Sequence, residues 1–154
     1  MFAPLLAFIE QRFTGQGAVE EVPHEALRLA TAALLVEMAR ADFDEDDMEL
    51  ERAGALLAER YGLSEQAARE LLAAAQTESD RAVSLFRFTH LINQQFAMPD
   101  KLALMGMLWE VAYADGRLDK HEDALMHKLA ELLYVPIGDL MLAKERVRTK
   151  KRER

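Results

Sequence analysis

The feature that most constrains the fold is an internal repeat, in which residues 33–61 align with residues 106–134. In each copy an apolar segment with helical spacing leads into an acidic turn and then into an amphipathic segment. Each copy is too apolar on one face to be stable alone. The repeat therefore predicts two antiparallel helix pairs that pack against each other about an approximate twofold axis. The aligned acidic pairs are Glu37 with Glu110, Asp42 with Asp115, Asp46 with Asp119, and Glu49 with Glu122.

The rest of the chain also has helical patterning. Its four prolines and seven glycines fall between segments whose apolar residues recur every three or four positions. These segments predict an all-α fold, a single compact bundle of about seven or eight helices. The expected helices cover residues 1–13, 24–41, 46–61, 64–75, 78–96, 99–114, 119–134 and 136–147.

A chain of 154 residues, 51% of them hydrophobic, fits one domain with an ample core. We divide it into an N-terminal amphipathic helix and loop (1–23), the helical domain (24–147) and a basic tail (148–154). The helix at 1–13, with one strongly apolar face, either docks on the core or lies on a membrane surface.

Charge is unevenly distributed along the sequence. The net charge is −8, but residues 144–154 carry +5, which leaves −13 on residues 1–143. So acidic a body repels phosphate backbones, which argues against nucleic acid as a partner. No apolar run approaches the ~20 residues of a membrane-spanning helix, and residues 1–13 lack a basic start. We therefore expect a cytoplasmic protein whose basic tail either frays or contacts an acidic partner or an anionic membrane surface.

Catalytic motifs are missing from the sequence. There is no cysteine, which excludes disulfides, thiolate metal sites and cysteine nucleophiles. The four histidines form no H-E-x-x-H, and neither a G-x-S-x-G nor a phosphate-binding glycine loop occurs. The sequence predicts a protein that is not an enzyme, with no catalytic residues.

The repeated turn has the pattern A-D-x-x-x-D-x-x-E, beginning at Ala41 and at Ala114. Its second Asp stands where a helix N-cap belongs, and the Glu three residues later has the spacing of a capping box. Such a box satisfies backbone amides at the helix start and contributes on the order of 1 kcal/mol without any ligand. Gly116 fits this interpretation, since a glycine just past a helix end closes the helix in the left-handed conformation.

The alternative interpretation is a divalent cation site. Clustered carboxylates are the ligands that hard cations prefer, and Asp42, Asp44 and Asp46 alternate like the first ligands of a calcium loop. The full calcium-loop pattern fails, because Asp47 stands where Gly is expected and Ala53 where Glu is expected. An ion would need another geometry, one that spans both turns.

Glu37 and Glu110 are the charged residues within two otherwise apolar helices, so both are expected to be buried acids that need a partner. Glu37 has Arg40 three residues away. Glu110 has no base at that spacing, which points to Arg117, and we expect its carboxylate to be partly buried near Asp115.

The string V-A-Y-A-D-G-R-L-D-K-H-E at residues 111–122, together with its partial copy, resembles the tellurite-resistance TerB-like family. That family is also similar to the N-terminal domain of a DnaJ-type co-chaperone. The resemblance covers about residues 27–147 and implies a helical bundle with internal pseudo-twofold symmetry. The acidic residues that it implies as metal ligands are Asp42, Asp46, Glu49, Asp115, Asp119 and Glu122, although Phe43 departs from the family string.

Two functions follow as expectations. The first is a non-enzymatic cytoplasmic accessory module of a tellurite or metal stress response in bacteria, whose acidic turns bind a divalent cation or a basic partner surface. The alternative is a structural protein–protein interaction domain or homodimer, in which the acidic residues only cap helices and the apolar face of residues 1–13 mediates association.

Overall fold

The computed structural model describes residues 24–41, 47–82 and 84–152, and the expected helix at 1–13 lies outside them. Every element of the described part is a helix, which confirms the all-α prediction. The helices are α2 (His24–Ala39), α3 (Asp47–Tyr61), α4 (Glu65–Arg81), α5 (Phe86–Gln95), α6 (Met98–Ala112), α7 (Lys120–Leu132) and α8 (Ile137–Arg152).

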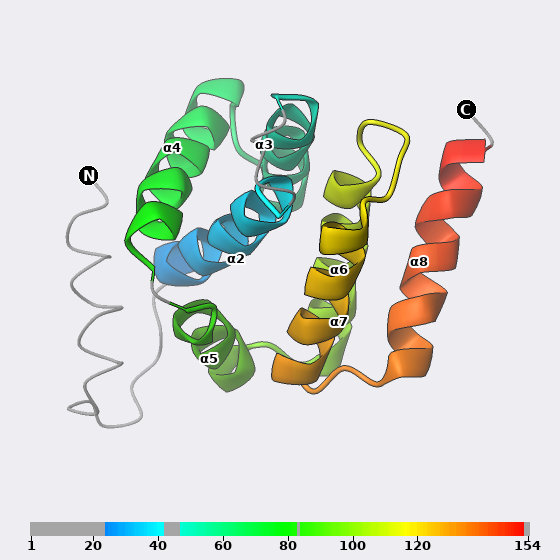
Figure 1. Ribbon diagram of the computed structural model, residues 1–154. Helices are drawn as coiled ribbons and strands as arrows, with labels where there is room; N and C mark the ends of the chain where they lie inside the picture. The colour runs from blue at the N-terminus through cyan, green and yellow to red at the C-terminus, as the bar shows by residue number, and fades with distance from the viewer. Residues whose placement is uncertain (1–23, 42–46, 83, 153–154) are drawn as a thin grey trace.

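The helices form two groups that lie side by side, with α2, α3 and α4 in one, α6, α7 and α8 in the other, and α5 between them (Figure 1). The three helices of the first group begin at residues 24, 47 and 65, and those of the second at 98, 120 and 137. This order and spacing are compatible with the internal repeat.

The core is built around α2 and α6. Helix α2 packs against α3, α4, α5 and α6, and its apolar residues from Leu29 to Ala39 are fully buried. On α6, Trp109 is fully buried, and its indole Nε1 donates a hydrogen bond of 3.1 Å to the carbonyl of Leu140 on α8. The two segments that the sequence marks as almost wholly apolar are therefore the central helices.

Three helix boundaries differ from expectation by five residues or more. The helix expected to begin at residue 78 begins at Phe86, as α5, and the ends of α4 and α8 also differ. Helix α4 continues through residues 76 and 77 to Arg81, because Leu71, Ala75 and Glu78 keep one buried face at helical spacing. It ends at Ala82, where the backbone becomes extended. Helix α8 runs to Arg152, five residues beyond the expected end at Val147, so most of the basic tail is helical.

The two helices that follow the acidic turns end in the same way, but on different residue types. Leu63 N donates to the carbonyl of Ala58 at 2.9 Å, and Val135 N donates to that of Ala130 at 2.8 Å. The left-handed residue that each closure requires is Gly62 (φ 63°) after α3 and Tyr134 (φ 58°) after α7. In the structure, Tyr134 is therefore equivalent to Gly62. The sequence alignment of the repeat pairs Tyr134 with Tyr61, one residue earlier.

Tyr134 should therefore carry backbone strain that glycine would relieve. A left-handed conformation costs a residue with a Cβ roughly 1–2 kcal/mol. We expect the free energy of unfolding in urea to be about 1 kcal/mol higher for Tyr134→Gly than for Tyr134→Ala. Both variants lose the ring, but only glycine removes the backbone strain. The alanine variant is the control for the loss of the contact in which Lys101 Nζ lies 5.7 Å from the Tyr134 ring centroid. Equal stability of the two variants would contradict the argument.

Candidate functional site

The acidic turn between α6 and α7 is held by its own carboxylates. Asp119 is the N-cap of α7, and its Oδ2 accepts a hydrogen bond of 2.7 Å from His121 N. Glu122 completes the capping box, because its Oε1 accepts a hydrogen bond of 3.0 Å from Asp119 N. Glu122 is 1% exposed. The capping box predicted for this copy is thus present, and it accounts for two of the carboxylates without a ligand.

Asp115 stabilises the same turn from its other end. Its Oδ1 accepts a hydrogen bond of 3.0 Å from Arg117 N, and Gly116 between them has the left-handed φ of 86° that was predicted. The side chain of Asp115 is exposed. Within the described residues its second oxygen, Oδ2, accepts no hydrogen bond, so this carboxylate faces solvent from a turn of fixed geometry.

Tyr113 lies at the base of this turn, where its ring is 6.2 Å from that of Trp109 between centroids. Burial raises the pKa of Tyr113 above its ordinary value, and the carboxylates of Asp123 and Glu145 add to this effect against the opposing charge of Arg148. The phenol is therefore neutral at physiological pH.

The first acidic turn is described only in part. Asp42 and Asp46 lie outside the described residues, as do Phe43 and Asp44. Glu49 is described, and at 1% exposure it is as buried near the start of α3 as Glu122 is near the start of α7. The two glutamates thus share the same position and the same burial.

The described residues do not form a metal site by themselves. Among them no three His, Asp or Glu side chains come together in a way that could hold an ion. The proposed ligand set also includes Asp42 and Asp46, so it stays a prediction, and a cation would require residues of the first turn.

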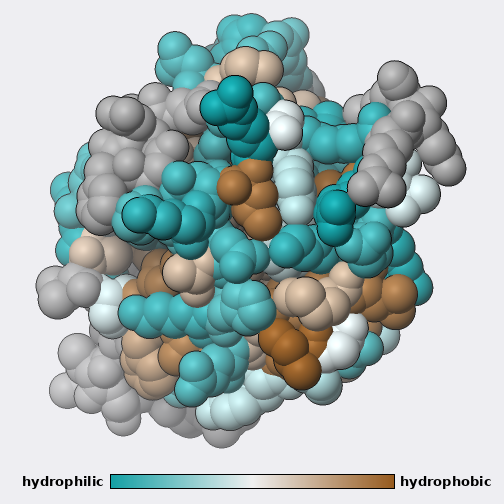
Figure 2. Space-filling view, turned by 45° about the vertical axis from the view of Figure 1, so that its right-hand side comes forward, coloured by the Kyte–Doolittle hydropathy of each residue, from teal (hydrophilic) through white to brown (hydrophobic). Residues whose placement is uncertain are grey.

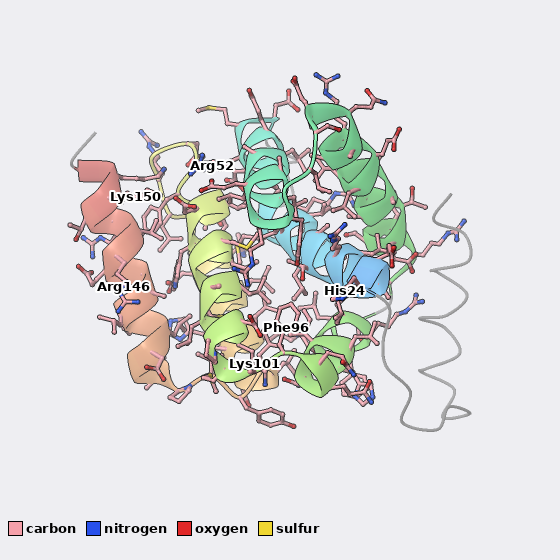
Figure 3. The ribbon with its side chains drawn as sticks, turned by 180° about the vertical axis from the view of Figure 1, so that it is seen from behind. His24, Arg52, Phe96, Lys101, Arg146 and Lys150 are labelled. Atoms are coloured by element: carbon pink, nitrogen blue, oxygen red, sulfur yellow. The ribbon has the colours of Figure 1, made fainter. Side chains whose placement is uncertain are left out.

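Glu110 is partly buried, as predicted, but its partners come from distant helices. Its side chain is 14% exposed, and Oε1 accepts a hydrogen bond of 3.0 Å from Arg52 Nη2 on α3. Lys150 Nζ on α8 lies 3.5 Å from the same oxygen. Glu110 is thus paired with Arg52 and Lys150, and not with Arg117, the partner that the sequence indicated. Figure 3 labels Arg52 and Lys150 on the two helices that flank the end of α6.

Glu37 also contacts a different residue from the one expected. It accepts a hydrogen bond from the hydroxyl of Ser79 on α4, whereas Arg40 Nη1 lies 2.6 Å from Asp80 Oδ1. Helix α4 thus supplies the partners of both Glu37 and Arg40. The aligned acids Glu37 and Glu110 therefore share a place in the repeat but not a kind of partner.

One buried acid was not predicted. Glu78 on α4 is fully buried and lies 3.3 Å from Arg87 Nη2 on α5. The signal in the sequence is its position on the apolar face of α4, three residues after Ala75 and four residues before Ala82. Because the expected helices end at residue 75 and begin again at residue 78, Glu78 was not assigned to the apolar face of α4.

A family model described as tellurite resistance protein TerB matches residues 28–145. The match spans both acidic turns and every described helix in whole or in large part. No curated protein and no solved structure gives a significant match to this chain. No helix of the described residues is long and apolar enough to cross a membrane.

Proposed function

The chain belongs to the TerB family of tellurite resistance proteins, and on that basis we propose that it is a non-enzymatic accessory module of a tellurite or metal stress response that acts through its acidic turns. The ligand that we propose for the turns is a divalent cation. The alternative ligand, which is also positively charged, is a basic surface of a partner protein. The module acts in the cytoplasm. The similarity to a DnaJ-type co-chaperone stays a prediction.

The observation that carries this proposal is the arrangement of Asp115. Its carboxylate is exposed, commits one oxygen to Arg117 N, and is fixed in a turn closed by Gly116 and the Asp119 cap. A hard cation gains from a carboxylate that is already oriented, because less conformational entropy is lost on binding. The repeat places a second acidic turn at Asp42–Glu49, which can supply the oxygens that the described turn lacks.

Isothermal titration of metal-stripped protein with Ca²⁺, Mg²⁺, Mn²⁺ and Zn²⁺ tests the proposal. We expect saturable binding of at least one ion, and we expect the double variant Asp42→Asn with Asp115→Asn to lose it, because each change removes a charged oxygen ligand. Asparagine retains an oxygen that can accept from Arg117 N, so the variant should keep its turn and its fold.

The matched control removes two exposed carboxylates elsewhere, with Glu65→Gln on α4 and Glu131→Gln on α7. It lowers the net negative charge by the same amount and should bind the ion as the natural protein does. If neither the natural protein nor the double variant binds any of the four ions, the cation proposal is wrong.

The capping box of α7 favours a second candidate function. Asp119 and Glu122 accept hydrogen bonds from backbone amides, so helix capping accounts for these two carboxylates without a ligand. In that case the chain is a structural interaction domain or a homodimer. Its expected apolar face at residues 1–13 lies outside the described residues, and comparing the mass in solution with and without residues 1–13 tests it.

A further inference from the structure

A groove runs between α3 and α8, with α6 as its floor, and none of the acidic turn residues that the structure describes lines it. It has a volume of about 700 Å³. Both wall helices pack on α6, and Figure 3 shows α8 and α3 on either side of it. The apolar residues that line it include Leu56, Leu102, Gly106, Met107, Leu142 and Val147.

The floor of the groove is open because α6 carries a glycine at its centre. A Cβ added to Gly106 would meet no atom within 4 Å. Glycine inside a helix costs roughly 0.5–1 kcal/mol relative to alanine, so its presence here has no advantage for the helix itself. Leu142 on the α8 wall is 51% exposed, which leaves an apolar side chain at the rim. Figure 2 shows that apolar surface on the side of the molecule carrying α8 occurs as separate patches among hydrophilic side chains.

The two ends of the groove differ in charge. The ion pairs Arg52–Glu110 and Arg60–Asp100 show that α3 runs antiparallel to α6. At the Glu110 end lie Arg52 and Lys150, and Arg146 lines the groove about one helical turn earlier on α8, which makes three cations against one carboxylate. Arg146 is exposed, and within the described residues it makes no ion pair or hydrogen bond. This end therefore carries an excess of positive charge on a protein that is otherwise acidic.

The opposite end of the groove is lined by Glu59 and Asp139, where Arg60 is already paired with Asp100. The groove thus has a positive end, an apolar middle and a negative end. From Leu102 to Glu110 its floor is about 12 Å long, which is the length of about two helical turns. A shallow apolar channel between parallel walls, with charges at the ends, is the form of surface that binds an amphipathic helix.

We propose that this groove binds an amphipathic helix of a partner protein, with its apolar face over Gly106 and Met107 and an acidic end against Arg52, Arg146 and Lys150. The charge complementarity selects the partner, because an acidic helix end is attracted by these cations and a basic one is repelled. The basic C-terminal segment, for which the sequence predicts either fraying or contact with an acidic partner or an anionic membrane surface, then forms the recognition end of α8.

The test uses a fluorescent helical peptide with leucines at positions i, i+3, i+4 and i+7 and three glutamates at one end, and a twin peptide with lysines in place of the glutamates. We expect the acidic peptide to bind the full chain at least about tenfold more tightly than its basic twin. Gly106→Leu should weaken that binding by about tenfold or more, because its side chain occupies the floor of the groove. It should not unfold the protein, since leucine is a better helix former and a Cβ at this position meets no atom within 4 Å.

Arg146→Glu should weaken binding of the acidic peptide about tenfold. Lys128→Glu is its matched control, because it makes the same charge change at an exposed position of α7 outside the groove. Equal binding of the two peptides, or unchanged binding to Gly106→Leu, would overturn the proposal. Tight binding to anionic phosphatidylglycerol vesicles together with no binding of the acidic peptide would also overturn it, in favour of a membrane surface.

Discussion

Replacing Trp109 with alanine should lower the free energy of unfolding by about 3–5 kcal/mol, the range for the removal of a fully buried large aromatic side chain. Trp109 is 0% exposed, and it joins α6 to α8 through the hydrogen bond to the Leu140 carbonyl. Lys144 Nζ on α8 lies 5.1 Å from its ring centroid and adds a cation–π contact. The loss should be measured by urea unfolding followed by circular dichroism, because Trp109 is the single tryptophan and its fluorescence disappears with it.

Trp109→Phe separates packing from hydrogen bonding. It keeps an aromatic ring but removes the indole donor and some volume, so we expect a loss of about 1–2 kcal/mol. A loss below about 1 kcal/mol for the alanine variant would contradict the buried position of this residue.

Arg52→Ala should have the second largest effect, a loss of about 2 kcal/mol in the free energy of unfolding. Removing one partner of a buried ion pair costs about 3–5 kcal/mol, and here the loss is smaller because Lys150 still faces Glu110. The matched control is Arg69→Ala on α4. Its ion pair with Glu65 is shorter, at 2.7 Å, but its side chains are 69% and 83% exposed. That pair should contribute less than about 1 kcal/mol.

A double-mutant cycle of Arg52→Ala and Glu110→Ala isolates the interaction itself. We expect a coupling energy of about 1–2 kcal/mol, because removing the carboxylate also removes the cost of leaving it without Arg52. Additive effects of the two substitutions would show that Arg52 stabilises α3 only through the packing of its stem.

The sequence predicts most of the local structure because local structure depends on neighbours along the chain. The capping box at Asp119 and Glu122 follows from a spacing of three residues, and the left-handed Gly116 follows from its place after a helix. The family match over residues 28–145 agrees with the resemblance that the second turn carries.

The long-range contacts could not be predicted in the same way. Arg52 and Lys150 meet at Glu110 only because α3 and α8 pack on opposite sides of α6, and nothing in the separation of these residues indicates that packing. For the same reason the groove was not foreseen, since it depends on three helices and on the space above one glycine. For the basic segment the composition predicts fraying or contact with another molecule, whereas Lys150 contacts Glu110 of the same chain and Lys151 Nζ lies 6.0 Å from the Tyr113 ring centroid.

The repeat aligns Gly106 with Ala33, which is fully buried on α2. The same position of the repeat is therefore buried in the core in one half of the molecule and lies beside open space in the other. A larger residue at Ala33 has to displace its neighbours, whereas one at Gly106 extends into empty space. At this position the first half is constrained by the packing of the core, whereas the second half has an open surface on which new binding specificity can evolve.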